Sequence, residues 1–167
     1  MLSRAGLEPV AYLGGDAETV IAAVTQILGA PDEDTGWVGG FHAGCPPPET
    51  RLLRWAGLLL YFSTGRTYYW GEGHPHFFSY NFSPEPSEAE LALTTAAGIG
   101  PGSTVDDLRR AYPTVEFFAT HAEEAGWGVP NVGRELFFEY PWFGGGATGS
   151  DTSDTISWLE AGYPCGE

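Results

Sequence analysis

The chain has 167 residues, a net charge of −15 from 22 acidic and seven basic side chains, and an aromatic fraction of 14%. This acidity argues against partners that would be repelled, namely nucleic acids and anionic membrane surfaces. No apolar run approaches the ~20 residues of a membrane-spanning helix. Two explanations of the acidity stay open: solubility or adaptation to a salty or GC-rich source, and attraction to a basic partner or a cation.

The first half of the chain is predicted to contain one helix. Residues 10–13 are expected to form a short leading strand or strap. Asp16 follows two glycines and can accept from the free N–H groups of a first helical turn. Apolar residues then recur at helical spacing until Gly29 and Pro31 end the pattern. The sequence therefore predicts a helix over residues 16–28.

Strands are expected to follow this helix. Ala56 and Gly57 lie between two apolar runs and indicate a tight hairpin. The acidic residues 32–34 lack the alternating ligands of a calcium loop and are interpreted as a solvated loop. The expected strands, chosen by alternation or by β-prone composition, are residues 51–55, 58–62, 67–70 and 77–82.

A Pro- and Glu-rich connector, residues 83–90, is expected to join two halves of a single domain, at about 10–83 and 91–162. In the second half, Ser103 is the predicted cap of a helix that Pro113 ends. Residues 91–95, 115–118, 135–140 and 154–160 are predicted strands, and residues 144–153 are predicted to be a flexible Gly/Ser/Thr loop.

The predicted fold class is α+β. Two repeats, each a helix followed by antiparallel strands, would form one sheet with the helices packed on one face. Aligning the two predicted caps places Ile21 opposite Leu108 and Val24 opposite Ala111.

The helix start and stop signals at residues 15–31 and, less completely, at 102–113 resemble the repeat of the β-lactamase-inhibitory-protein and outer-membrane small-lipoprotein group. Residues 93–104 and the terminal Gly-x-x-Cys-Gly-Glu are similar to uncharacterised secreted proteins of actinobacteria. The resemblance implies a concave, exposed antiparallel sheet, the surface with which the inhibitor grips its partner. Here the helix regions look single and the two cysteines are far apart, so no inhibitory residue is transferred.

The expected location is outside the cytoplasm, secreted or in the cell envelope. The first residues lack the apolar segment of a signal peptide, so the expectation includes a signal peptide that has been removed. Cys45 and Cys165 both lie among Gly and Pro and are predicted to form a disulfide that closes a long loop. The alternative is two unrelated buried thiols.

An aromatic stretch, residues 68–77, is the main candidate for chemistry. His74 and His76 would point the same way in an extended chain, and with Glu72 they would make a two-His, one-carboxylate metal set. An exposed loop, or an aromatic platform for a protein or carbohydrate, is the alternative. The candidate binding residues are Tyr68, Tyr69, Trp70, His74, His76, Phe77 and Trp142.

The function favoured by these patterns is a secreted binding module that presents an aromatic sheet face to a protein or glycan, without a cofactor. The alternative is a small, metal-dependent hydrolase centred on His74, His76 and Glu72, and a third is a structural wall-associated protein. Motifs for a serine nucleophile elbow, a phosphate loop or a zinc protease do not occur in the sequence. The sequence therefore leaves open whether the protein is an enzyme.

Overall fold

The computed structural model describes residues 1–3, 5–39, 49–84, 91–118, 134–139 and 143–162. Within them the chain combines two helices with antiparallel strands, which confirms the α+β class. Two regions that bear on the predictions lie outside the described residues: most of the connector 83–90, and both Cys45 and Cys165. The division into halves and the disulfide therefore stay predictions.

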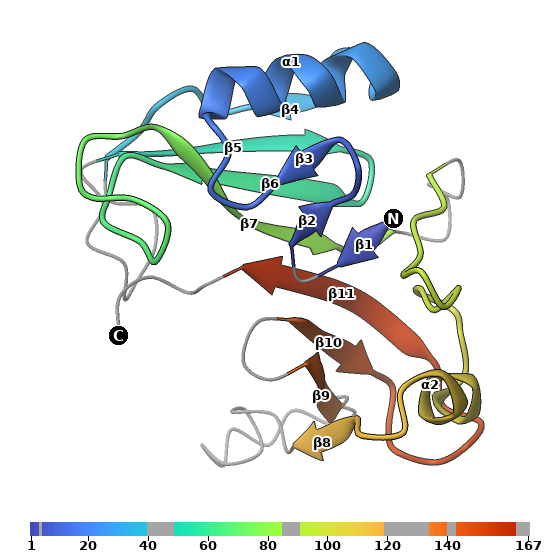
Figure 1. The fold of residues 1–167 in the computed structure, drawn as a ribbon. Coiled ribbons are helices and arrows are strands. Elements are labelled where there is room, and N and C mark those ends of the chain that lie inside the picture. The colour runs from blue at the N-terminus through green and yellow to red at the C-terminus, as the bar shows by residue number, and fades with distance from the viewer. Residues whose placement is uncertain (4, 40–48, 85–90, 119–133, 140–142, 163–167) are drawn as a thin grey trace.

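The larger sheet has eight antiparallel strands in the order β4-β5-β6-β7-β11-β10-β9-β8 (Figure 1). Its centre is the pair β7–β11, in which Tyr80 lies opposite Ala161 and Phe82 opposite Leu159. The strands from β4 to β6 lie on one side of this pair, and the strands from β8 to β10 on the other. The bounds are β4 Glu33–Asp34, β5 Thr50–Trp55, β6 Leu58–Ser63, β7 His76–Phe82, β8 Glu116–Phe118, β9 Arg134–Glu139, β10 Phe143–Ala147 and β11 Ile156–Gly162.

A second, three-stranded sheet corrects the prediction of a single sheet. It consists of β1 (Leu2–Ser3), β2 (Gly6–Leu7) and β3 (Ala11–Tyr12). These strands are too short to show an alternating pattern in the sequence. They are attached to the larger sheet through the buried Tyr80, whose hydroxyl donates to the carbonyl oxygen of Ser3 at 2.9 Å.

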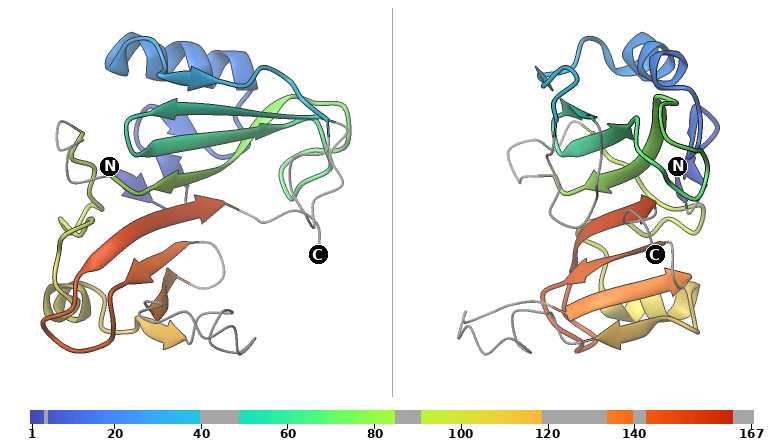
Figure 2. Two further views of the ribbon diagram at one scale, coloured as in Figure 1. Left: turned by 180° about the vertical axis from the view of Figure 1, so that it is seen from behind. Right: turned by 90° about the vertical axis from the view of Figure 1, so that its left-hand side faces the viewer.

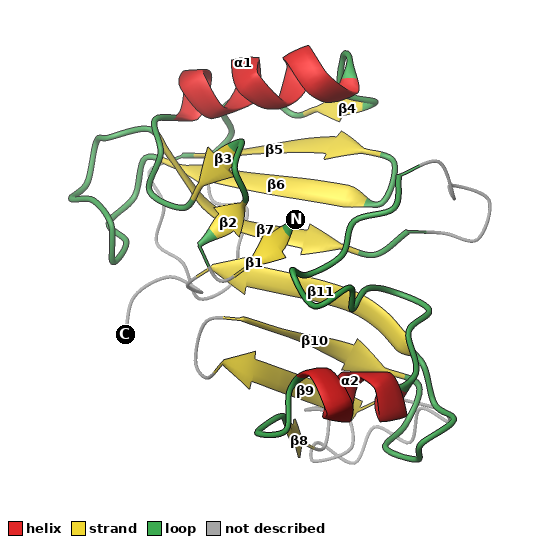
Figure 3. Ribbon diagram, turned by 45° about the vertical axis from the view of Figure 1, so that its right-hand side comes forward, coloured by secondary structure: helices red, strands yellow, loops and turns green. Residues whose placement is uncertain are grey.

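Both helices and the small sheet cover the same face of the large sheet. Side chains of α1 (Ala17–Leu28) and α2 (Val105–Ala111) belong to one apolar cluster with the small sheet and the inner residues of the large one. Figure 3 shows α1, the small sheet and α2 in succession in front of the large sheet, and Figure 2 shows α1 and the small sheet from the side. Within the described part of the chain, neither helix has the length and apolarity needed to cross a membrane.

Both helices begin at a residue whose side chain caps the first turn, as predicted, but the capping residue of α2 is not the predicted one. Asp16 caps α1 by accepting from the backbone N–H of Thr19 at 3.0 Å, as expected. The cap of α2 is Thr104, which accepts from the N–H of Asp107, and not Ser103, whose hydroxyl accepts from Gly100. The two predicted caps were therefore out of register by one residue. Cap-to-cap alignment now pairs two buried residues, Val20 and Leu108.

The same hydrogen bonds occur at the start of each helix. Gly14 donates its N–H to the carbonyl of Phe77, and Gly102 donates to that of Ile156. The first helical N–H groups, at Ala17 and Val105, donate to the carbonyls of Pro75 and Asp154. The loop before β7 thus stabilises the start of α1, as the loop before β11 stabilises the start of α2.

Other predictions fail where packing outweighs local preference. The stretch 67–70 is a loop, and the stretch 91–95 makes only an isolated bridge from Thr95 to Leu2. The expected loop 144–153 begins with the buried strand β10. The acidic stretch 32–34 contains β4, which pairs with β5 and whose carboxylates contact Arg51 and Arg54.

Arg51 joins three elements, and we expect Arg51→Lys to lower the free energy of unfolding by about 1 kcal/mol. Its guanidinium contacts Asp34 of β4 through two bonds, at 2.8 and 2.6 Å, and Glu18 of α1 at 2.9 Å. Its side chain is only 17% exposed, and a lysine cannot reproduce the two-pronged contact. Urea denaturation would measure the change.

Arg54→Lys is the matched control for this prediction. Arg54 contacts Glu33 at 3.3 Å, and both side chains are about half exposed. This substitution should change the free energy of unfolding by less than about 0.5 kcal/mol. Equal losses in the two variants would contradict a stabilising role specific to Arg51.

Candidate binding site in the loop between β6 and β7

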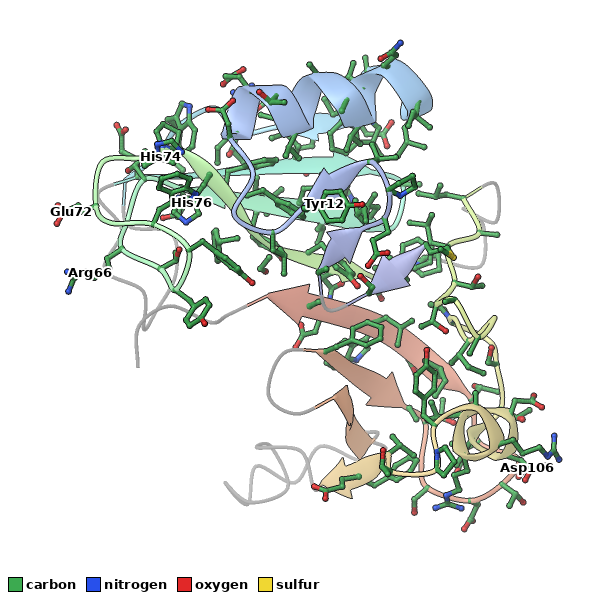
Figure 4. All side chains as sticks on the ribbon, in the orientation of Figure 1. Tyr12, Arg66, Glu72, His74, His76 and Asp106 are labelled. Carbon is green, nitrogen blue, oxygen red and sulfur yellow. The ribbon has the colours of Figure 1, made fainter. Side chains whose placement is uncertain are left out.

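The loop from residue 64 to residue 75, here called the aromatic loop, joins β6 to β7 beside the start of α1 (Figure 4). Its backbone is held by its own hydrogen bonds. Gly73 donates its N–H to the carbonyl of Thr64 at 2.6 Å, and Thr67 donates to that of Trp70 at 2.9 Å. Together with the hydrogen bond from Ala17 to the carbonyl of Pro75, these bonds link the loop to itself and to the start of α1.

His76 is a buried residue that holds the loop through hydrogen bonds of its ring. Its ring is fully buried, with Nδ1 2.6 Å from the carbonyl oxygen of His74 and Nε2 2.6 Å from Oγ1 of Thr67. A carbonyl can only accept, so these partners assign the proton to Nδ1, and Nε2 accepts the hydroxyl proton of Thr67. Oγ1 of Thr67 in turn accepts from the N–H of Tyr69 at 3.2 Å. Burial lowers the pKa of His76 and favours this neutral ring.

The aromatic side chains pack against the segment that enters α1. The indole N–H of Trp70 donates to the carbonyl of Gly14 at 2.6 Å, and its ring stacks on His74 with 4.0 Å between centroids. Gly14 has φ +83°, and a Cβ there would lie 3.0 Å from the ring of Tyr69. Only glycine suits both its conformation and the close approach of this ring.

Two aromatic side chains of the loop remain open to solvent. Tyr68 is 78% exposed and Trp70 is 44% exposed, and Tyr12 of β3, two residues from Gly14, is 49% exposed. Within the described residues, the other exposed large apolar side chains are Met1 and Ile27, and none of the five lies on the large sheet. Among the side chains that the structure describes, the exposed aromatic rings therefore lie beside the large sheet.

The remaining predicted site residues are separated by the fold. Phe77 is fully buried in the core cluster, so it cannot contact a partner in this conformation. Trp142 lies outside the described residues. Nε2 of His74 is buried and has no hydrogen-bond partner in the described part of the chain.

The predicted metal set is not assembled. Within the described residues, no three His, Cys, Asp or Glu side chains lie close enough together to hold a metal ion. Both ring nitrogens of His76 are occupied by hydrogen bonds, while Glu72 points outward from the loop (Figure 4). A hydrolase centred on His74, His76 and Glu72 has no support from this geometry, because a buried ring with two occupied nitrogens can neither ligate a metal nor reach a substrate.

Two parts of the site could not be found in the sequence. Tyr12 and Gly14 belong to a segment far from the loop in the sequence, with 56 positions between Gly14 and Trp70, and only the fold brings them together. The double glycine at residues 14–15 is the sequence signal for this close approach, although the helix start that follows also accounts for it.

Comparison with known protein families, with characterised proteins and with solved structures gives no match for this chain.

Proposed function

We propose that this protein is a binding module that contacts a partner protein through the aromatic loop. The observation that supports this most strongly is the exposure of Tyr68 and Trp70 on a backbone that is already held in place. An ordered loop loses little conformational entropy on binding, so its exposed rings can contribute most of their burial energy to affinity.

A protein is favoured over a glycan by the residue types of the loop. Tyrosine, tryptophan and arginine are the side chains that most often dominate protein–protein contacts, and the loop presents Tyr68, Trp70 and Arg66. One face of the Trp70 indole is already stacked on His74, which leaves less of the flat surface on which a sugar ring packs.

The comparison between the two halves also supports this assignment. We propose that the halves are copies of one unit, since each has a helix, four strands of the large sheet and the same bonds at its helix start. The loop before β11, residues 148–155, contains only Thr, Gly, Ser and Asp, whereas its counterpart is longer and aromatic. A scaffold does not require this difference, so we attribute it to function.

The resemblance to the β-lactamase-inhibitory-protein group and a location outside the cytoplasm remain part of the proposal. The strand order and the packing of both helices on one face are compatible with that resemblance. The contact surface proposed here differs, because it is a loop at the side of the sheet and not the sheet face.

The proposal predicts that binding depends on the rings of Tyr68 and Trp70. A random dodecapeptide library displayed on phage and a glycan array are the probes, with the full chain immobilised. Clones enriched on the wild type should bind Tyr68→Ala and Trp70→Ala at least ten-fold more weakly, because the exposed rings supply the contact area.

Ile27→Ala is the matched control, since Ile27 is an exposed apolar residue of α1 outside the loop. It should retain full binding. Circular dichroism and thermal unfolding of each variant would exclude a general loss of structure. Enriched clones that bind all three variants like the wild type would refute the proposed site.

A further inference from the structure

We infer that the partner is a basic polypeptide, whose arginine or lysine side chains pack on the exposed rings of the aromatic loop. This inference rests on the proposed function and adds the chemical class of the partner. It depends on the charges that surround Tyr68 and Trp70.

Acidic side chains surround the loop. Glu72 is exposed on the loop itself, and Asp16 and Glu18 are exposed at the start of α1, which the loop contacts. The carbonyl of Glu49, whose side chain is also exposed, accepts from the N–H of Thr64 at 3.1 Å. Exposed carboxylates thus come from the loop itself and from two segments that are hydrogen-bonded to it.

Few cations offset these carboxylates among the described residues nearby. The guanidinium of Arg51 is already engaged by Asp34 and Glu18 and is mostly buried. Arg66 is exposed and points outward from the loop (Figure 4). Among the described groups named here, the five carboxylates (Asp16, Glu18, Asp34, Glu49 and Glu72) outnumber the two guanidinium groups, so their sum is negative.

Negative charge beside exposed aromatic rings favours one kind of ligand. A cation over a tyrosine or tryptophan face is attracted by the ring quadrupole, and nearby carboxylates strengthen that attraction. The chain already contains one such contact, where the guanidinium carbon of Arg109 lies 5.0 Å above the ring of Phe117. Tyr68 and Trp70 are exposed aromatic rings of the type that takes part in such contacts.

The charge of the whole chain acts in the same direction. A chain with 22 acidic and seven basic side chains attracts a basic partner over long distance and raises its association rate, and it repels an acidic one. An effect of this kind weakens as salt is added.

The test uses the dodecapeptide library described above, restricted to clones that lose binding to Tyr68→Ala. These clones should be enriched in arginine and lysine relative to the input library. Synthetic copies should bind at least five-fold more weakly in 500 mM than in 50 mM NaCl.

Two charge-reversal variants test whether the electrostatic effect on peptide binding arises at the aromatic loop. Glu72→Lys should weaken binding of the synthetic peptides at least three-fold. Glu116→Lys makes the same change of net charge at an exposed position of β8, at the far edge of the large sheet, and should weaken it less than two-fold. Equal effects would show that net charge alone acts and would overturn the local inference.

The outcomes separate the two proposals. Loop-dependent clones that are neutral or acidic, or a loop-dependent glycan on the array, would overturn the basic partner and leave the loop as the binding site. Clones that bind Tyr68→Ala as well as the wild type would overturn the proposed function itself.

Discussion

Replacing Gly146 by alanine is expected to lower the free energy of unfolding by about 3 kcal/mol, the upper end of the usual cost of overpacking a core. Gly146 lies in the buried strand β10, opposite Trp158 of β11. A Cβ at this position would lie 2.2 Å from Nε1 of Trp158 and 2.6 Å from Cε2. The indole would have to move or the two strands would have to separate. Urea or thermal denaturation measures the loss.

The double variant Gly146→Ala/Trp158→Ala tests the cause. Removing the indole removes the clash, so adding the alanine in the Trp158→Ala background should cost less than about 1 kcal/mol. Gly71→Ala is the matched control, because a Cβ there meets nothing within 4 Å and the residue does not have a positive φ. If Gly146→Ala were as stable as Gly71→Ala, the indole would not pack on β10 as described.

Acidification is expected to lower the free energy of unfolding through His76. The expected loss is about 1–3 kcal/mol, the cost of a buried polar group that lacks a hydrogen-bond partner. The folded protein keeps this ring neutral, so its pKa lies below the ordinary value of 6.5. The stabilisation is complete above pH 6.5 and is lost as the pH falls below that value. A protonated Nε2 could no longer accept from Thr67, and the anchor of the aromatic loop would be lost.

His76→Gln isolates this effect, because glutamine keeps a polar side chain but does not titrate. We expect the slope of the free energy of unfolding between pH 6.5 and pH 5 to be smaller in this variant than in the wild type. At Tyr69 and Gly73, protection from hydrogen exchange relative to the intrinsic rate at each pH should decrease in acid in the wild type alone. Identical slopes in the two proteins would contradict the role of His76.

Carboxylates act in a separate pH range. The pKa of Asp34 is lowered by its hydrogen bonds to Arg51, and that of Asp16 by its bonds to Thr19. Both lie below the ordinary value of 3.8, so the stabilisation they provide is present above that pH and is lost below it. The difference between wild type and His76→Gln above pH 5 is therefore attributable to the histidine.

Local signals were sufficient for α1 and for the hairpin of β5 and β6. Asp16, the apolar spacing and Gly29 specify a helix within a dozen neighbouring residues. The turn at Ala56 and Gly57 lies between two runs that pair directly. In such elements the deciding contacts are close in sequence, so composition and spacing are enough.

Strand β10 shows why other elements could not be predicted. A run of three glycines usually indicates a flexible loop, because it has no side chains to pack. Here the absence of side chains is the requirement, since the indole of Trp158 lies against Gly146. The partner comes from a different strand, and no local rule refers to it. β4 is similar, because its acidic residues are paired by two arginines of β5.

The candidate site also has a part that composition predicts and a part that only the fold decides. Tyr68, Tyr69 and Trp70 were identified by composition alone, as a dense aromatic group among Gly and Pro. Which aromatic residues reach solvent depended on the fold: Phe77 enters the core, whereas Tyr68 stays exposed. His76 is a predicted metal ligand, but in the structure it is buried and holds the aromatic loop through hydrogen bonds. It is buried because the short segment at Gly14 and Gly15 pairs with the start of β7.

The sequence by itself determined the α+β class, the excess of negative charge, the two helix starts to within one residue, and the aromatic character of residues 68–77. These properties follow from composition and from contacts within a few residues. The tertiary structure decided the second sheet, the strand made of glycines, the loss of the metal set and the exposure of Tyr68 and Trp70. Each of these depends on burial, and burial is set by strands and loops that are distant in the chain.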